Sequence, residues 1–284
     1  MIRLIATDLD DTLLDAGSAL TARARAALEA AMTAGCGVAI VSGRMLEATL
    51  PFAREIGVNA PMVIYNGAMV YDHRSGETLY ARRIPFETAL GMLRMIEAMG
   101  LYVQLYPGMG YFCDTPLPQT EVYAKQIRVP VTPVHMPLSR WLEEHPCDPQ
   151  KLLLIDTPEG ATAAQAALTK AFPSGVCCMK SKPHYLEIMP EGVNKGHALA
   201  ALAEGLGVAP GEVMAFGDGE NDVPMLTFAG AGFAMANGCE PARTRARHIA
   251  PPNTEDGVAQ VVEQYLRQGL IGPLPKTPQE VSRS

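Results

Sequence analysis

The sequence predicts an α/β protein whose doubly wound parallel sheet carries an inserted α+β domain. Two observations lead to this prediction. Short apolar runs alternate with helical stretches near both ends of the chain, which is the pattern of parallel strands joined by helices. Between these parts lies a stretch dense in proline, in which short strands outnumber helices. A chain of 284 residues can hold both parts, since one domain commonly takes ~150 residues.

The first part of the chain alternates between strand and helix. Its opening apolar run ends at an acidic residue and has the length of a buried strand. Thr21 is a suitable N-cap for the helix that follows, and Gly35 is a suitable stop. Pro51 should kink or split the second helix. The expected elements are strands over 3–7, 38–41 and 62–65, a helix over 22–34 and a helix that ends at 56.

The middle of the chain follows a different pattern. A hairpin is expected where the strands 68–71 and 79–84 flank turn residues. The prolines then become dense, and the strands are no longer separated by crossover helices. We therefore expect a discontinuous core, 1–82 and 190–284, and an inserted α+β cap, 83–189. Within the insert we expect helices over 86–99 and 159–172 and strands over 102–106, 152–156, 176–181 and 185–189.

The alternation of strand and helix resumes after Pro190. The final stretch, 271–284, contains three further prolines and is expected to be a loose terminus. The expected elements are helices over 195–206, 223–228 and 258–268 and strands over 213–216 and 232–236.

Composition argues against several classes of protein. The net charge of −7 argues against nucleic acid or an anionic membrane surface as the main partner. No apolar run approaches the ~18–20 residues of a membrane helix, and the opening residues turn acidic where a signal peptide would stay apolar. The six cysteines form no C-x-x-C pair. We expect reduced, mostly buried thiols in a cytoplasmic protein.

The segment Asp8-Leu9-Asp10-Asp11-Thr12 follows the first predicted strand. Three acids this close cannot all ionise freely unless a cation neutralises them or one stays protonated. An ionised carboxylate can act as a nucleophile, a neighbour with a raised pKa can act as general acid and base, and Mg²⁺ prefers oxygen ligands. A solvated acidic loop is the alternative interpretation.

Three further segments lie at strand ends or helix starts. Ser42-Gly43-Arg44 could hold an anion through a hydroxyl and a close backbone N–H, although it could also be an ordinary turn. Lys195 begins a predicted helix and could stabilise a transferring phosphoryl group, or it could be a surface lysine. The run from Gly217 to Asp222 is rich in acids and suits a metal, or an acidic turn with a helix N-cap.

The combination of these segments is more informative than any one of them. In a doubly wound sheet the carboxyl ends of the strands converge on one crevice. That crevice would contain a nucleophile, an acid and base, a hydroxyl, a lysine and a set of metal ligands. These groups together suit phosphoryl transfer through an aspartyl-phosphate.

In their order along the chain, the motifs DLDDT, SGR, the lysine of GVNKG, and GDGEND resemble the haloacid dehalogenase-like superfamily. The closer resemblance is to its Cof-type branch of Mg²⁺-dependent phosphatases, which have a Rossmann-like core and a large inserted cap. The match covers roughly 1–82 and 190–268, and one departure is Asp11, where many relatives have glycine. The resemblance implies a phosphatase of small phosphomonoesters, such as sugar phosphates or phosphorylated cofactors.

The resemblance also implies roles for individual residues. Asp8 would be the nucleophile, Asp10 the acid and base, and Lys195 the neutralising cation. The implied metal ligands for Mg²⁺ are Asp8, Asp10, Asp218 and, at longer range, Asp222. The implied phosphate-binding and loop-supporting residues are Leu9, Thr12, Ser42, Gly43 and Asn221. The candidates for substrate contact are Arg44, Asn66 and Gly67.

Two other functions use the same residues. A phosphomutase or phosphotransferase would pass the phosphoryl group to a sugar hydroxyl instead of water. A receiver-like phosphoacceptor or phosphate sensor would keep the aspartyl-phosphate without turnover, although such domains are typically about half this length. The sequence does not reveal the physiological substrate, the cap residues that contact it, the oligomeric state or the role of Asp11.

Overall fold

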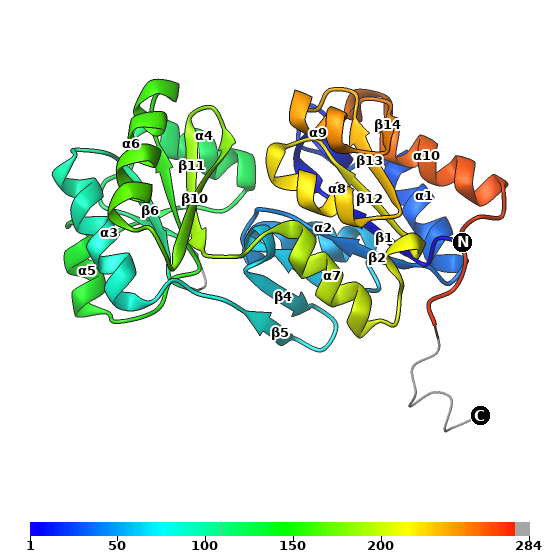
Figure 1. Cartoon of the computed structure of the whole chain (residues 1–284), viewed down its shortest axis with the longest axis horizontal. Coiled ribbons are helices and arrows are strands. Elements are labelled where there is room, and N and C mark those ends of the chain that lie inside the picture. Colours follow the sequence, from blue (N-terminus) through cyan, green and yellow to red (C-terminus); the bar gives the residue numbers. More distant parts are fainter. Residues whose placement is uncertain (109, 276–284) are drawn as a thin grey trace. The chain divides into compact units, whose positions relative to one another are not determined.

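The computed structural model describes residues 1–108 and 110–275, which divide into two compact units (Figure 1). The first unit contains Met1–Gly43, Thr49–Tyr80 and the chain from Asn194 onward. The second contains Arg44–Ala48 and Ala81–Val193. Each unit has a hydrophobic core of its own. The α/β class predicted from the sequence is confirmed.

The first unit is built on a parallel sheet with the strand order β14-β13-β12-β1-β2. Every residue is buried in four of its five strands, β1, β2, β12 and β13, which explains why they appear in the sequence as continuous apolar runs. Because β1 lies between β2 and β12, the strand order reverses there, and the carboxyl ends of β1 and its neighbours meet at one edge. The strands are β1 (Leu4–Thr7), β2 (Gly37–Ile40), β12 (Val213–Gly217), β13 (Ala231–Met235) and β14 (His248–Ala250).

Helices cover this sheet in two groups. α1 packs against α10, and α7 packs against α8. Thr21 caps α1 as expected, since its hydroxyl accepts a hydrogen bond of 3.0 Å from the amide of Ala24. The helices are α1 (Ala22–Thr33), α2 (Leu46–Ile56), α7 (Lys195–Gly205), α8 (Val223–Phe228), α9 (Glu240–Arg245) and α10 (Gly257–Arg267).

Two expectations for the first unit need correction. α2 continues as one helix through the exposed Pro51, so this proline does not split it. The chain after 270 is not loose as far as it is described, since Ile271 bridges to Ile2 and the amide of Leu274 donates to the carbonyl of Gly35. The rest of the expected terminus, 276–284, lies outside the described residues.

The third strand also differs from the prediction. β3 (Met62–Ile64) is joined to β2 only by a single parallel bridge, Val41 to Val63. Its main partner is β4 (Met69–Asp72), which runs antiparallel to it and continues into β5 (Glu77–Ala81) at the edge of a three-stranded sheet. The hairpin expected between β4 and β5 is therefore present.

The second unit contains a six-stranded, mostly antiparallel sheet with the order β10-β11-β9-β6-β7-β8. Its strands are β6 (Val103–Tyr106), β7 (Phe112–Cys113), β8 (Thr132–Pro133), β9 (Lys151–Ile155), β10 (Val176–Lys182) and β11 (Tyr185–Pro190). Its helices are α3 (Phe86–Ala98), α4 (Pro118–Ile127), α5 (Leu138–Glu144) and α6 (Pro158–Ala171). Sequence reasoning missed α4, α5, β7 and β8, because the prolines around them indicated irregular chain.

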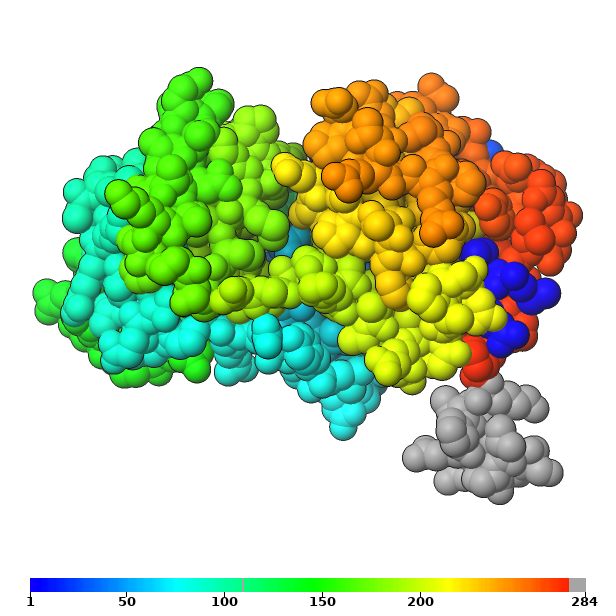
Figure 2. All heavy atoms as spheres, in the orientation of Figure 1, coloured from blue at the N-terminus to red at the C-terminus, as the bar shows by residue number. Residues whose placement is uncertain are grey.

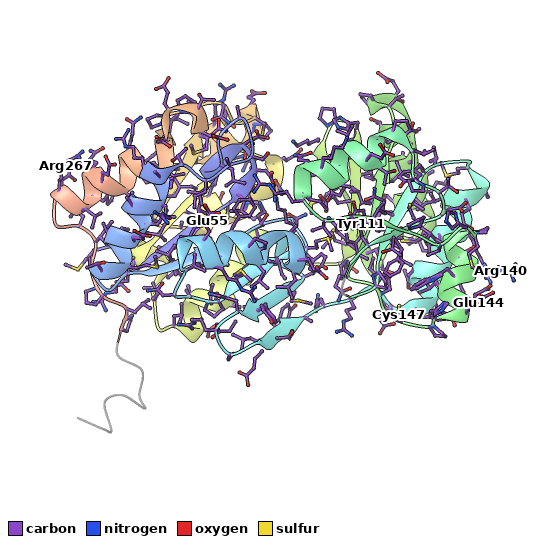
Figure 3. All side chains as sticks on the ribbon, turned by 180° about the vertical axis from the view of Figure 1, so that it is seen from behind. Glu55, Tyr111, Arg140, Glu144, Cys147 and Arg267 are labelled. Atoms are coloured by element: carbon purple, nitrogen blue, oxygen red, sulfur yellow. The ribbon has the colours of Figure 1, made fainter. Side chains whose placement is uncertain are left out.

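The two faces of this sheet differ in chemistry. One carries alternate leucines and isoleucines that pack with α3, α5 and α6 into the core of the unit. The other carries buried polar side chains, among them Lys151, whose ammonium lies 3.1 Å from a carboxylate oxygen of Glu187 and 4.7 Å from the ring centre of Tyr106. Tyr111 stacks on that ring and lies inside the unit, whereas Arg140 and Glu144 form an ion pair on its surface (Figure 3).

All six cysteines lie in the described part of the chain and are free thiols, two of them buried and four half-buried. Among the described residues, no helix combines the length and the apolar character required to cross a membrane.

Candidate active site

Asp8 is the first residue after β1 and starts the loop on which the site is built. Its backbone amide donates to the carbonyl of Phe216 at the end of β12, so Asp8 continues the pairing of the two central strands. The next five residues form a single tight turn, which closes when the amide of Leu14 donates to the carbonyl of Leu9. The carboxylate of Asp8 is therefore placed at the edge where the strands end.

Two asparagines from near the other end of the chain hold this turn through hydrogen bonds. The side-chain amide of Asn237 donates to the carbonyl of Asp11 at 2.8 Å, and that of Asn253 donates to the carbonyl of Leu14 at 2.8 Å. Asp11 takes a left-handed backbone conformation, with φ at 56°. Sequence reasoning assigned no role to either asparagine. The position of Asn237 just after a predicted strand was the available signal.

Lys195 is the first residue of α7, which begins with an N-cap formed by Asn194. Its side chain is fully buried, so the surface interpretation is wrong. The ammonium lies 3.0 Å from an oxygen of Asp8 and 2.5 Å from an oxygen of Asp222. Burial alone would lower the pKa of Lys195, but attraction to the two carboxylates outweighs it and raises that pKa.

The loop after β12 is shaped around the carboxylate of Asp222. Its second oxygen accepts hydrogen bonds from the amides of Asp218 and Gly219, at 2.9 and 2.8 Å. A Cβ at Gly217 would lie 2.4 Å from the side chain of Asp222, so only glycine fits there. One oxygen of Asp222 thus positions Lys195, and the other holds this loop.

Asp218 points toward the turn after β1. The hydroxyl of Thr12 donates to one of its oxygens at 2.8 Å. Carboxylate oxygens of Asp8, Asp218 and Asp222 all lie within 4.8 Å of one another. The structure therefore brings together two acidic segments that are far apart in the sequence, since Thr12 and Asp218 are 206 positions apart.

The pKa values show that this group of acids has more negative charge than Lys195 can neutralise. Burial, with a contribution from Asp222, raises the pKa of Asp218 to about 8. Burial also raises the pKa of Asp8 to about 7, although Lys195 acts in the opposite direction. One lysine therefore does not neutralise two buried carboxylates and a half-buried third. Oxygen donors with surplus negative charge are the donor set that Mg²⁺ prefers.

The residues predicted to bind phosphate lie in the same unit. The side-chain amide of Asn221 donates to the side-chain oxygen of Asn66 at 2.9 Å, and the amide of Asn66 donates to the carbonyl of Ser42. A Cβ at Gly43 would lie 2.8 Å from that same oxygen of Asn66. These contacts link the loops that follow β2, β3 and β12.

The remaining predicted residues take different places. Gly67 has a φ of 102°, and a Cβ there would lie 2.5 Å from the carbonyl of Asn194, so it shapes the backbone beside α7. Leu9 is buried and Asp10 half-buried in the turn after Asp8. Arg44 belongs to the second unit, where its buried guanidinium donates to the carbonyl of Ala48.

Comparison with known proteins identifies the family. A sequence profile described as haloacid dehalogenase-like hydrolase matches residues 5–262. The chain belongs to this family. The solved structure of a haloacid dehalogenase-like hydrolase from Bacteroides thetaiotaomicron is similar to it, with a TM-score of 0.84 and 27% identity over 93% of this chain and 99% of that one.

Two curated relatives are named as phosphatases. Pyridoxal phosphate phosphatase YbhA of Escherichia coli is 29% identical over 93% of this chain and 98% of its own length. The 5-amino-6-(5-phospho-D-ribitylamino)uracil phosphatase YitU of Bacillus subtilis is 27% identical over 93% of this chain and 97% of its own length. The protein is thus an enzyme of the phosphoric monoester hydrolase class, which argues against the receiver-like alternative.

Proposed function

We propose that the protein is a Mg²⁺-dependent phosphatase of small phosphomonoesters that works through an aspartyl-phosphate on Asp8. The contact that carries this proposal is the one between Lys195 and Asp8, at 3.0 Å, beside the second acid Asp218. It holds a carboxylate in a fixed orientation at the end of β1, where its free oxygen can attack phosphorus. The same lysine would neutralise charge on the transferring group.

The proposed reaction has two steps. In the first, an oxygen of Asp8 attacks the phosphorus, the bond to the ester oxygen breaks, and Asp10 donates a proton to the leaving alcohol. In the second, Asp10 removes a proton from water, which attacks the phosphorus of the aspartyl-phosphate and releases phosphate and free Asp8. Backbone amides around Leu9 and Gly43, with the side chains of Ser42 and Asn221, would bind the phosphate oxygens in both steps.

Mg²⁺ would be held by Asp8, by Asp218 and by the backbone carbonyl of Asp10, with Asp222 positioning the loop behind them. Thr12 occupies one oxygen of Asp218, which leaves the other for a cation, and Asp8 would offer the cation the oxygen that also faces Lys195, while its other oxygen attacks phosphorus. When bound, such a cation neutralises charge that builds up on the phosphoryl oxygens.

The substrate is proposed to be a small phosphorylated metabolite, either a sugar phosphate or a phosphorylated cofactor. The names of the relatives from Escherichia coli and Bacillus subtilis, which mention a cofactor phosphate and a phosphoribityl compound, support this substrate class. We also propose that the inserted part, 83–189, selects the substrate and that the enzyme is cytoplasmic.

The proposal is tested by measuring hydrolysis of an aryl phosphate with and without Mg²⁺. Activity should require the cation, and Asp8→Asn should reduce kcat at least ~10³-fold, because the nucleophile is removed. The matched control is Asp11→Asn, the same change at an exposed position in the same turn, which should keep most of the activity because asparagine tolerates a left-handed conformation. Full activity in Asp8→Asn would refute the mechanism.

A second measurement distinguishes the two steps. Asp10→Asn removes the proton donor and the base, so a phosphoenzyme should accumulate when a substrate with a good leaving group is supplied. Intact-mass spectrometry of the quenched enzyme would detect the added phosphoryl group, which should be absent from Asp8→Asn. Product analysis in the presence of a sugar monophosphate distinguishes hydrolysis from transfer to a sugar hydroxyl.

A further inference from the structure

The carboxylate of Glu47 holds one hydrogen bond and presents a second, buried oxygen that has none. Glu47 lies in the first turn of α2, in the segment Arg44–Ala48 that belongs to the second unit. Its Oε1 accepts a hydrogen bond of 2.6 Å from the amide of Gly110, in the same unit. Its Oε2 has no hydrogen-bond partner among the described residues. A buried acceptor without a donor points to strain, to a catalytic or binding role, or to a bound molecule.

The place of Glu47 in the chain favours a role in binding substrate. Glu47 follows Ser42, one of the proposed phosphate-binding residues, by five positions, a stretch that spans at most ~18 Å even when fully extended. This limit is set by the covalent chain and does not depend on how the two units are arranged. Glu47 is therefore a candidate for contact with the alcohol part of a phosphomonoester whose phosphate is bound at Ser42.

Gly110 also connects Glu47 to the polar face of the sheet in the second unit. The residue after it, Tyr111, stacks on Tyr106 of β6, with the ring centres 5.3 Å apart. Tyr106 lies opposite Lys151 of β9, and both belong to the buried polar face. The opposite face packs against α3 and α6, which lie at the surface of the second unit in Figure 2. Glu47 is thus joined through one loop to the polar face and not to the hydrophobic core.

The polar face carries a second buried polar atom without a partner. Gln104 lies two positions before Tyr106 on β6, so the two side chains are on the same face. The side-chain oxygen of Gln104 accepts a hydrogen bond of 2.9 Å from the hydroxyl of Tyr106. Its side-chain nitrogen has no hydrogen-bond partner within the described part of the chain, although the residue is fully buried. Gln104 thus offers a donor, whereas Glu47 offers an acceptor.

Hydroxyl groups suit this combination better than other groups. A hydroxyl can donate to the carboxylate of Glu47 and accept from the amide of Gln104. An ammonium can only donate, and a carboxylate can only accept and is repelled by Glu47. An apolar ring would leave both polar atoms buried without partners, which is unfavourable. A ligand with several hydroxyl groups can therefore satisfy both residues.

We propose that Glu47 accepts a hydrogen bond from a hydroxyl group of the leaving alcohol, and that the substrate is a polyhydroxylated phosphomonoester such as a sugar or sugar-alcohol phosphate. This inference rests on the proposed function and deepens it, since it chooses sugar phosphates over phosphorylated cofactors. Glu47 is a specificity-determining residue in this account and takes no part in the transfer of the phosphoryl group.

The first test compares matched pairs of substrates. Sorbitol 6-phosphate is paired with 6-phosphogluconate, and glycerol 3-phosphate with 3-phosphoglycerate. The members of each pair differ only at the carbon farthest from the phosphate, which belongs to a hydroxymethyl group in one and a carboxylate in the other. For at least one pair, kcat/KM of the wild type should be at least ~10-fold higher for the hydroxyl-bearing member. That member should also be preferred over phosphoethanolamine and pyridoxal 5′-phosphate.

The second test changes Glu47 itself. Glu47→Gln keeps an oxygen for the amide of Gly110, so the loop stays in place, but it removes the charge. The variant should lose at least ~10-fold more kcat/KM for the preferred polyol phosphate than for an aryl phosphate, which has no hydroxyl group to bind. The matched control is Glu55→Gln, the same change at an exposed position near the other end of α2 (Figure 3), which should leave the ratio of the two activities unchanged.

A third measurement does not depend on turnover. In an Asp8→Asn background, isothermal titration calorimetry compares the binding of the preferred polyol phosphate with that of inorganic phosphate. The polyol phosphate should bind at least ~10-fold more tightly, and adding Glu47→Gln should remove most of this difference.

Three results would overturn the inference. They are a preference for the carboxylate members, for phosphoethanolamine or for pyridoxal 5′-phosphate, equal losses of polyol and aryl phosphate hydrolysis in Glu47→Gln, and equal binding of the polyol phosphate and inorganic phosphate. Failure of the proposed mechanism would instead appear as full activity of Asp8→Asn, and the comparison of Glu47→Gln with Glu55→Gln would still decide the role of Glu47.

Discussion

Lys195 contacts two carboxylates at once from a position that solvent does not reach. Removing one partner of a buried ion pair leaves charge without compensation, which commonly costs about 3–5 kcal/mol. In the proposed mechanism, the same ammonium fixes the oxygen of Asp8 that would not attack phosphorus. A single side chain thus contributes both to folding and to the proposed chemistry.

We expect Lys195→Met to lower the free energy of unfolding by about 3 kcal/mol and to remove phosphatase activity. Urea denaturation followed by circular dichroism measures the first effect, and aryl phosphate hydrolysis measures the second. Lys170→Met, at an exposed position near the end of α6, is the matched control and should change neither by more than a small amount. A variant with wild-type stability would show that the ion pairs of Lys195 contribute little.

Residues of the site differ in how well the sequence predicts them. Asp8 and Asp218 stand directly after apolar runs, and the rule that strand ends converge predicted that they meet. Asn237 and Asn253 support the turn through backbone carbonyls, and such contacts leave no pattern in the sequence. Outside the site, Lys151 and Glu187 of the second unit form a buried pair that only the strand register brings together.

At the level of elements, the position of Lys195 depends on how closely α7 approaches α8. These two helices pack against each other, and the contact is close enough to exclude a side chain. A Cβ at Gly196 would lie 2.6 Å from the backbone of Pro224 at the start of α8. Because backbone atoms cannot move aside as a side chain can, any residue larger than glycine must separate the helices.

Gly196→Ala should therefore lower the free energy of unfolding by about 1–3 kcal/mol and reduce activity, because α7 carries Lys195. Gly205→Ala is a matched control in the same helix, since nothing lies within 4 Å of a Cβ there. It should raise stability by about 0.5 kcal/mol through a smaller loss of backbone entropy. Chemical denaturation of both variants measures the difference, and equal effects of the two changes would contradict this account of the packing.

The elements that could be predicted are those whose burial is reflected in the local sequence. β1, β2 and β12 are apolar throughout because both faces of a parallel sheet are covered. α4 and α5 were missed because each follows a proline that also fits a loop. The strand β3 was predicted correctly in position, but its pairing depends on the hairpin that follows it and is not encoded within its own residues.

At the level of the whole molecule, the surplus of negative charge at the site opposes folding. Two buried carboxylates and a half-buried third share one lysine, and burial together with the neighbouring carboxylates raises the pKa of Asp218. Such strain is common at functional sites, where stability is given up for chemistry. A cation that binds the folded chain and not the unfolded chain would relieve it.

Mg²⁺ should therefore raise the unfolding temperature of the protein, with a stabilisation of about 2.7 kcal/mol when its concentration is a hundred times the dissociation constant. Asp218→Asn should abolish this response, because it removes a proposed ligand of the cation. The same variant should unfold at a higher temperature than the wild type in the presence of a chelator, because one charge of the crowded acidic group is gone. Asp114→Asn, at an exposed position in the second unit, should respond to Mg²⁺ as the wild type does. Differential scanning calorimetry of the three proteins measures these shifts. A response to Mg²⁺ that survives in Asp218→Asn would place the cation elsewhere in the chain.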